Sequence, residues 1–185
     1  MYKHSDRLLK RYNSTRWAKL CHEIAKYAPF NYDQHGVYLA DEWTSFYDIE
    51  KRALPVADYI KVEQDYIETA LEIISKTDVV YVTIGYLEKH RFFSCSFEKR
   101  LPDYQSLKRS FNHIRQGQRI LANSSQMQIL LKLCLREKLW CILINNKRNF
   151  ELSFGYDYYM IMHSALPETD VKDIVERHNL YYNPR

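Results

Sequence analysis

Residues 135–162 read LREKLWCILINNKRNFELSFGYDYYMIM, and this stretch decides the fold. In residues 139–144 apolar side chains occupy both alternating faces, which is typical of a strand buried inside a sheet. Residues 145–149 are of types that tolerate positive φ and hydrogen-bond their own backbone, so they predict a turn. We therefore expect an antiparallel hairpin with an aromatic second arm over residues 150–161. Nothing in this arm looks like a reaction centre, and much of it looks like a scaffold or a contact surface.

The sequence around the hairpin predicts helices. Residues 56–76 carry their apolar side chains in one broad helical stripe, and Pro55 suits the first turn. Ser124 or Ser125 predicts the start of another helix, because serine caps free backbone N–H groups. Weaker patterns predict helices over 14–27, after Pro102 and after Pro167, strands over 78–84 and 92–97, and a final aromatic strand at 180–182. Helices and antiparallel strands in separate runs indicate an α+β fold: a single globular domain over residues 1–185, its antiparallel sheet packed with several helices.

The composition is that of a soluble protein with an excess of tyrosine. Sixteen of the 185 residues are Tyr, a side chain favoured at half-buried positions and at protein interfaces. Tyrosine replacing phenylalanine on partly wet strands is the simpler explanation. No apolar run is long enough to span a membrane, and the N-terminus lacks the apolar segment of a signal peptide, so we expect a cytoplasmic protein. The four widely spaced cysteines predict buried, reduced thiols.

The charges are distributed in blocks. Residues 41–78 contain ten acidic and four basic side chains, whereas residues 79–150 contain thirteen basic and four acidic ones. A net charge of +4 therefore conceals an acidic and a basic segment, and each could present an electric field to a partner.

Candidate catalytic and metal-binding residues are scarce. With four glycines in the chain there is no nucleophile elbow, phosphate-binding loop or dinucleotide fingerprint. Cys95 near His90 is the nearest approach to a nucleophile–base pair, and a core thiol explains it better. The histidines have no metal-ligand spacing, and the carboxylates Glu63 and Asp65 are expected on a solvated helix face. We therefore expect no enzyme, no cofactor, no metal and no small-molecule ligand.

Two segments carry a resemblance to a known group of proteins. The order LREKLWC…L…F…FGYDYYM, followed by a short polar link, a helix and the strand LYY, resembles bacterial immunity proteins. A second block runs from DEWTS (41–45) to YIKVE (59–63). Immunity proteins are small cytoplasmic proteins that neutralise cognate toxins of contact-dependent-inhibition and related polymorphic toxin systems. The resemblance implies stoichiometric, non-catalytic binding of a toxin domain, with a nuclease-type toxin as the first expectation.

The toxin-contact residues expected from this resemblance are acidic and aromatic. Carboxylates with aromatic anchors would complement the basic cleft of a domain that grips RNA or DNA. The candidates, the last three of them on condition that they point outward, are Asp33, Asp41, Glu42, Trp43, Tyr47, Asp48, Tyr156, Asp157 and Tyr158. A solvated loop and helix face would explain the same residues. Immunity proteins against nucleases tend to be acidic, whereas this chain has a pI near 8.7, so its basic block could equally meet an acidic toxin.

The basic segment 89–119 supports an alternative, a small nucleic-acid-binding or regulatory protein. Basic side chains bind phosphates and aromatic rings stack on unpaired bases. The basic candidates are Lys89, Arg91, Lys99, Arg100, Lys108, Arg109, Arg115 and Arg119. Because no RNA-binding motif and no DNA-reading helix accompanies them, nucleic acid is the less favoured partner, and a charged helix face covering the sheet is the simplest explanation.

Overall fold

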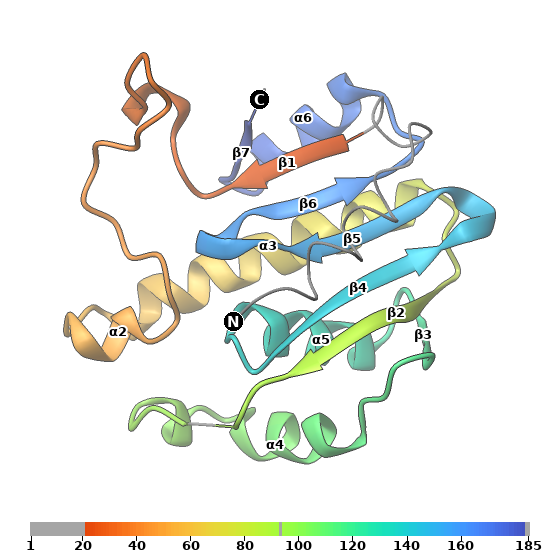
Figure 1. Cartoon of the computed structure of the whole chain (residues 1–185), viewed down its shortest axis with the longest axis horizontal. Helices are drawn as coiled ribbons and strands as arrows, with labels where there is room; N and C mark the ends of the chain where they lie inside the picture. The colour runs from red at the N-terminus through yellow and green to blue at the C-terminus, as the bar shows by residue number, and fades with distance from the viewer. Residues whose placement is uncertain (1–20, 93, 184–185) are drawn as a thin grey trace, which may run out of the picture.

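The computed structural model describes residues 21–92 and 94–183, and its fold is the predicted α+β arrangement. Seven strands form one antiparallel sheet in the order β3-β2-β4-β5-β6-β1-β7 (Figure 1). The strands are β1 Cys21–Ala25, β2 Tyr81–Lys89, β3 Arg119–Leu121, β4 Leu139–Asn145, β5 Phe150–Phe154, β6 Met160–His163 and β7 Tyr181–Asn183. The described α-helices are α2 Asp48–Lys51, α3 Val56–Lys76, α4 Tyr104–His113, α5 Ser125–Leu135 and α6 Glu168–Arg177.

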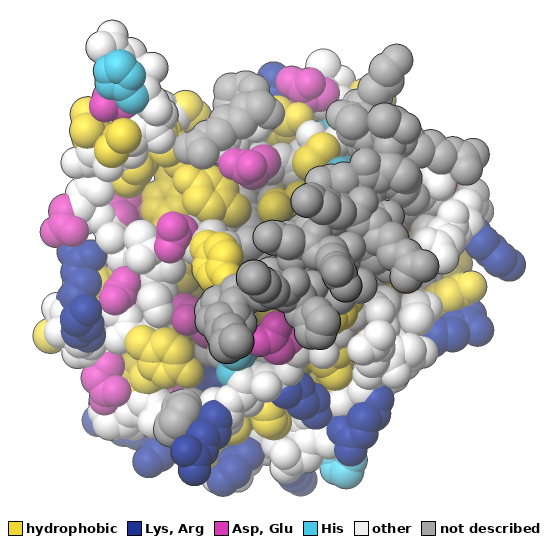
Figure 2. All heavy atoms as spheres, in the orientation of Figure 1, with side chains coloured by type: hydrophobic (Ala, Val, Ile, Leu, Met, Phe, Trp, Pro, Cys, Tyr) yellow, Lys and Arg dark blue, Asp and Glu magenta, His cyan; other side chains and the backbone are white. Residues whose placement is uncertain are grey.

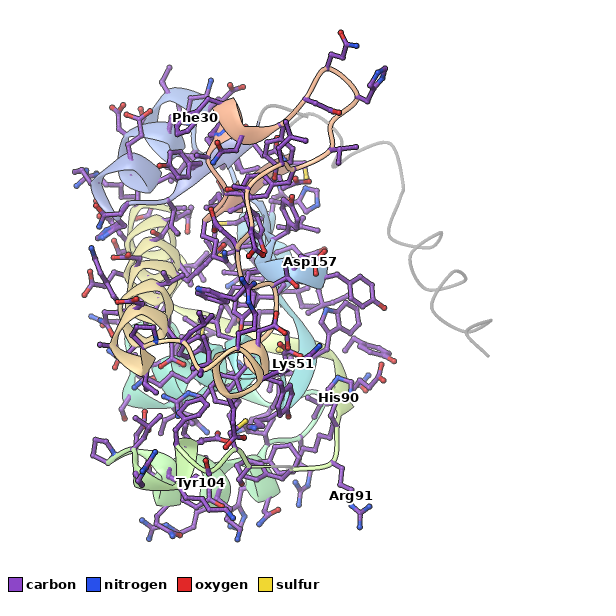
Figure 3. All side chains as sticks on the ribbon, turned by 90° about the vertical axis from the view of Figure 1, so that its left-hand side faces the viewer. Phe30, Lys51, His90, Arg91, Tyr104 and Asp157 are labelled. Atoms are coloured by element: carbon purple, nitrogen blue, oxygen red, sulfur yellow. The ribbon has the colours of Figure 1, made fainter. Side chains whose placement is uncertain are left out.

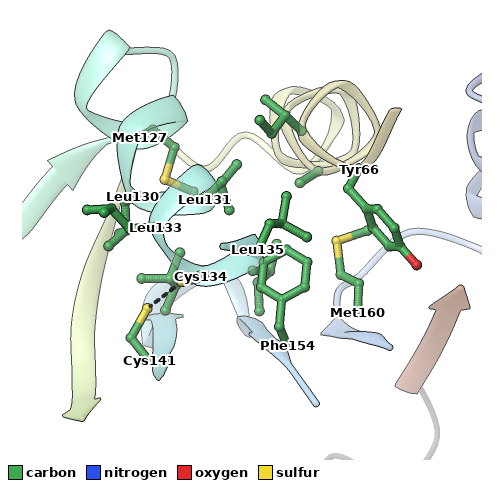
Figure 4. Packing of buried hydrophobic residues seen from close by; sticks show 14 of the residues in the cluster. Tyr66, Met127, Leu130, Leu131, Leu133, Cys134, Leu135, Cys141, Phe154 and Met160 are labelled. Atoms are coloured by element: carbon green, nitrogen blue, oxygen red, sulfur yellow. Dashed lines mark hydrogen bonds between the residues drawn. The ribbon is translucent and has the colours of Figure 1, made fainter. Parts of the chain in front are cut away.

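The main core lies between one face of the sheet and the helices. Helices α3, α5 and α6 cover this face, and none of the described helices lies over the opposite face (Figure 1). β4 is an interior strand of the sheet, as its doubly apolar pattern predicts, and Leu139, Cys141 and Leu143 are buried. Figure 4 shows how α5 packs on these strands, with the sulfur atoms of Cys134 and Cys141 3.6 Å apart.

The second hairpin arm is not one strand, so the expectation of a single arm over 150–161 is wrong. The chain turns after Gly155 and returns as β6, which pairs with β5. The Gly155 amide donates to the Tyr159 carbonyl at 2.7 Å and closes the turn. Asp157 and Tyr158 adopt left-handed backbone conformations, with φ of 54° and 62°. The turn brings the aromatic residues to one end of the sheet.

The helix expected over 14–27 is also wrong where the structure describes it. Cys21–Ala25 form strand β1, which pairs with β6 on one side and β7 on the other, and residues 14–20 lie outside the described residues. Both neighbours come from the end of the chain, and this pairing buries Ile24 in the core. Tertiary pairing therefore overrides the local helical spacing.

Most other predicted elements are confirmed, with shifted limits for the strands. α3 begins and ends where the stripe predicts, and the helices after Pro102, Ser124 and Pro167 are present. β2 starts at Tyr81 and runs on to Lys89. The described residues of 92–97 form an irregular connection instead of a strand, and Phe93 lies outside the description. The edge strand β3 is an addition that the sequence did not indicate.

Two buried ion pairs lie under the end of the sheet that carries the β5–β6 turn. Arg136 binds both oxygens of Glu63, at 2.7 and 2.8 Å, and both side chains are almost fully buried. Lys138 lies 2.9 Å from Glu98, and both side chains are fully buried. The expectation that Glu63 faces solvent is therefore wrong, because its partner Arg136 neutralises it inside the core. These pairs fasten the turn between α5 and β4 to α3 and to the connection after β2.

Candidate interaction surface

The long connection between β1 and α3 crosses this end of the sheet and is anchored by aromatic side chains. Phe46 is fully buried, and its backbone amide donates to Glu137 at 2.7 Å. Trp43 is half-buried, with its ring centroid 5.0 Å from that of Tyr158 and 5.5 Å from that of Tyr59. The packing of Phe46 and Trp43 therefore holds the connection in place, although it contains little regular structure.

Large apolar side chains project from this connection and from the β5–β6 turn. Phe30 is 82% exposed, Leu39 70% and Tyr156 87%, and Val37 is also exposed. The two segments are joined by a 2.6 Å hydrogen bond between the hydroxyls of Tyr32 and Tyr159. Figure 3 looks onto this end of the sheet, with Phe30 and Asp157 labelled. Grouped exposed apolar side chains mark sites of interaction more often than scattered ones do.

Carboxylates surround these apolar side chains. Asp41 is 90% exposed at its side chain and lies 2.8 Å from Arg52. Asp157 is exposed and forms no ion pair within the described part of the chain. Figure 2 shows hydrophobic and acidic side chains interspersed over the left of the molecule, among a few basic ones. We call this region the acidic–aromatic surface and define it by Phe30, Asp33, Val37, Leu39, Asp41, Glu42, Asp48, Glu50, Tyr156 and Asp157.

Two of the predicted carboxylates shape the loops that carry the surface. Asp33 accepts from the backbone amides of His35 and Val37, at 2.8 and 2.9 Å. Asp48 accepts from the amides of Thr44 and Ser45, at 3.0 and 3.1 Å. Both groups fix loop conformation and still contribute negative charge to the surface.

Glu42 belongs to a partly buried polar cluster at the base of the surface. It lies 2.6 Å from the Lys26 ammonium and accepts a short hydrogen bond from the Tyr38 hydroxyl. The same ammonium lies 4.3 Å from the ring centroids of both Tyr27 and Trp43. Burial lowers the pKa of Lys26, and the Glu42 carboxylate opposes that shift. The Lys26 ammonium thus neutralises the Glu42 charge within the protein, and the Glu42 side chain is only partly exposed to a partner.

Three predicted aromatic contacts are largely structural. Tyr158 is 6% exposed and donates to the Leu135 carbonyl at 2.8 Å, so the condition that it point outward is not met. Trp43 and Tyr47 are half-buried, and burial raises the pKa of Tyr47 to about 12. The left-handed backbone at Asp157 and Tyr158 explains why neighbouring residues differ in exposure, because it turns Tyr156 and Asp157 outward and Tyr158 inward.

A group of tyrosines in edge-to-face and tilted contact adjoins the surface, and the sequence predicted only part of it. Ring centroids lie 5.0 Å apart for Tyr27 and Tyr38, 4.9 Å for Tyr32 and Tyr38, and 5.5 Å for Tyr27 and Tyr159. We call Tyr27, Tyr32, Tyr38 and Tyr159 the tyrosine cluster. No local pattern predicts the contact between Tyr27 and Tyr159; the high tyrosine content was the available signal.

The basic segment lies at another edge of the molecule, around α4. Figure 2 shows Lys and Arg side chains gathered along the bottom of the view. The exposed members are Arg91, Lys99, Arg100, Lys108, Arg109, Arg115 and Arg119. Lys89 is half-buried and donates to the Phe111 carbonyl.

Most of the described aromatic residues of that segment face the core instead of solvent. Phe97, Tyr104 and Phe111 are all buried, and the Arg119 guanidinium lies on Tyr81, 3.6 Å from the ring centroid. Rings in these positions cannot stack on unpaired bases, which is how an aromatic, basic surface holds a single strand. A hollow of about 390 Å³ between α4 and α5 has a mixed polar and apolar lining that includes Arg109, His113 and Ile129. The described part of the segment therefore supplies positive charge but no exposed aromatic ring on which an unpaired base could stack.

The described residues contain no group of three or more His, Cys, Asp or Glu side chains placed to hold a metal ion. Among the helices described here, none combines the length and the apolar character required to cross a bilayer. Comparisons with protein-family models, with curated proteins and with solved structures give no significant match to this chain. Function is therefore inferred from the shape, exposure and charge of the surfaces described above.

Proposed function

We propose that this protein is an immunity protein, which binds a cognate bacterial toxin domain stoichiometrically and without catalysis. The observation that carries the proposal is the exposure of Phe30, Leu39 and Tyr156 beside carboxylates that include Asp41 and Asp157. Apolar anchors supply most of the binding energy at protein interfaces, and complementary charge speeds capture. A basic, nuclease-type toxin domain fits this chemistry, and the cytoplasm is where such a toxin would be met.

The scaffold beneath the surface favours tight binding. The connection that carries Phe30 and Asp41 is anchored by Phe46 and Trp43, and the turn beneath it is held by the buried pairs of Arg136 and Lys138. A preorganised surface loses less conformational entropy when it binds. The surface can therefore remain largely unchanged on complex formation.

Co-expression with the toxin domain encoded in the neighbouring gene tests the proposal. The tagged toxin domain should capture this protein at a 1:1 ratio, and the protein should restore growth to cells that express the toxin. A toxin domain that captures nothing and still arrests growth would contradict the immunity function.

Charge reversal locates the contact. Asp41→Lys combined with Asp157→Lys should abolish capture and rescue, because it places positive charge opposite a basic cleft. The matched control is Lys108→Glu combined with Arg109→Glu, two exposed residues of α4. Loss of capture in the control alone would move the interface to the basic segment and overturn the assignment of the acidic–aromatic surface.

A further inference from the structure

Tyr27 carries a buried hydroxyl that has no hydrogen-bond partner within the described part of the chain. The side chain is 4% exposed, and its ring is enclosed by those of Tyr38 and Tyr159. Leaving a buried hydroxyl without a partner is costly, and such groups in a native protein call for an explanation. Burial, with the nearby Asp157 carboxylate, raises the pKa of Tyr27, so its hydroxyl stays protonated and neutral.

The other hydroxyls of the tyrosine cluster are engaged. Tyr32 and Tyr159 hydrogen-bond each other at 2.6 Å, and Tyr38 donates to Glu42 while it accepts from Asn31 at 3.2 Å. Tyr32, Tyr38 and Tyr159 are half-buried, so each keeps some exposure to solvent. The cluster thus offers aromatic faces around one unused polar atom.

The charge at this place is negative. The Lys26 ammonium is already compensated by Glu42 at 2.6 Å, and its side chain is 5% exposed. Asp157 follows Tyr156 in the β5–β6 turn, two residues before Tyr159, and forms no ion pair among the described residues. One carboxylate is therefore left to attract a cation. It is held by a left-handed, non-glycine backbone, a conformation that clusters at functional sites.

We propose that the tyrosine cluster and Asp157 form a receptor for a single arginine side chain of the bound partner. This inference rests on the proposed function, because the arginine belongs to the toxin domain. A guanidinium lies flat on aromatic rings and carries five N–H donors, which suit a carboxylate and a hydroxyl acceptor together. Access to the Tyr27 hydroxyl requires one of the rings packed on it, Tyr38 or Tyr159, to change rotamer, a movement common at interfaces.

A small probe tests the receptor without the toxin. N-acetyl-arginine amide is titrated into the full-length protein and followed by NMR of backbone and tyrosine-ring resonances. The control probe is N-acetyl-citrulline amide, which keeps the planar shape and loses the charge. Saturable shifts at the tyrosine cluster with arginine alone support the inference. Equal responses to the two probes, or no response to either, overturn it.

Two conservative variants test the receptor in the complex. Tyr27→Phe removes the unpartnered hydroxyl, and Asp157→Asn removes the charge while keeping a residue that tolerates the left-handed backbone. Each should weaken binding of the neighbouring-gene toxin domain by about tenfold or more, as expected for a hydrogen bond to a charged group. Tyr86→Phe, a half-buried tyrosine beside Trp140, is the matched control and should bind like the parent.

Failure of this inference is distinguishable from failure of the proposed function. If the parent protein binds the toxin domain and both variants bind it equally well, the arginine receptor is wrong and the immunity function stands. If the parent protein captures no toxin domain while arginine amide still binds the cluster selectively, the receptor is supported and the proposed function is contradicted. Folding of both variants is checked by their thermal unfolding.

Discussion

Arg136 joins three segments that are far apart in the sequence. Its guanidinium binds Glu63 of α3 and also donates to Asp103, just before α4, at 3.1 and 3.0 Å. Arg136 itself lies in the turn between α5 and β4. A planar group with five donors can satisfy two carboxylates at once, which lysine cannot do in the same geometry. This residue therefore fixes the base on which the acidic–aromatic surface is built.

Removing Arg136 should be strongly destabilising. Arg136→Met leaves the Glu63 carboxylate buried without a charged partner, with the Tyr59 hydroxyl as its remaining donor at 3.1 Å, and this costs about 3–5 kcal/mol of unfolding free energy. Combining it with Glu63→Leu removes the stranded charge, so the double variant should be more stable than Arg136→Met alone. Urea denaturation at neutral pH measures both. A loss below about 1 kcal/mol for the single variant would contradict this account of the ion pair.

Two substitutions of Asp157 should distinguish the effect of backbone strain on stability from the effect of charge on binding. Asp157→Val places a β-branched residue at a φ of 54° and should lower stability by about 1–2 kcal/mol. Asp157→Asn tolerates that conformation and should leave stability nearly unchanged. Both variants should bind the toxin domain more weakly, because both lose the carboxylate. Equal thermal stability of the two would show that the turn is not constrained in the folded protein.

Among the helices and strands, sequence patterns predicted those whose formation depends on local side-chain burial. The broad stripe of α3 follows from burial on one face, and the apolar residues on both faces of β4 fit its place inside the sheet, so both elements were predicted from sequence. β1 is only five residues long, and its partners β6 and β7 lie at the other end of the chain. No local pattern can reveal such pairing. The burial of Glu63 was missed for the same reason, since Arg136 is 73 residues away.

The start of α5 depends on a single cap. The Ser124 hydroxyl oxygen accepts from the Met127 amide at 3.2 Å and donates to the Leu121 carbonyl at 2.7 Å. Ser124→Ala should therefore cost about 1 kcal/mol, as loss of a helix cap does. Ser125→Ala, an exposed residue one position later, is the control and should change stability little. Thermal unfolding of the two variants under identical conditions compares them, and equal losses would contradict the assigned cap.

The edge formed by β1, β7 and α6 should weaken in mild acid. His22 is 2% exposed, and its Nδ1 lies 3.3 Å from the Tyr182 hydroxyl. Burial lowers the pKa of His22; Glu168 opposes this shift and His163 adds to it. The folded protein therefore keeps His22 neutral, whereas the unfolded chain takes up a proton below a pH of about 6.5. Protonation favours unfolding, because the unfolded chain binds the proton more tightly.

Unfolding free energy should consequently fall as the pH drops from about 7.5 to 5.5, by less than about 1.4 kcal/mol per pH unit from this one group. His22→Asn cannot titrate and should show a shallower dependence over the same range. Urea denaturation of both proteins at several pH values gives the difference. Parallel curves for the two proteins would rule out a contribution from His22.

Across the whole molecule, opposite charges are separated in space. The acidic–aromatic surface occupies the end of the sheet with the β5–β6 turn, and the basic side chains gather around α4 (Figure 2). The charge blocks of the sequence predicted this separation in part, since four of the ten acidic residues in block 41–78 belong to the surface and five lie on α3. The composition of the surface was predicted less well. Tyr158 is buried. The exposure of Phe30 and Leu39, and the place of Tyr27 in the tyrosine cluster, depend on the path of the chain between β1 and α3.

Calorimetric titration of this protein with the neighbouring-gene toxin domain tests whether this end of the sheet binds the toxin domain. We expect a 1:1 complex whose affinity falls with added salt and falls by about tenfold or more in Asp41→Lys with Asp157→Lys. Lys108→Glu with Arg109→Glu should bind like the parent protein. No heat of binding for the parent, or equal affinity for the acidic-surface variant and the parent, would contradict the account.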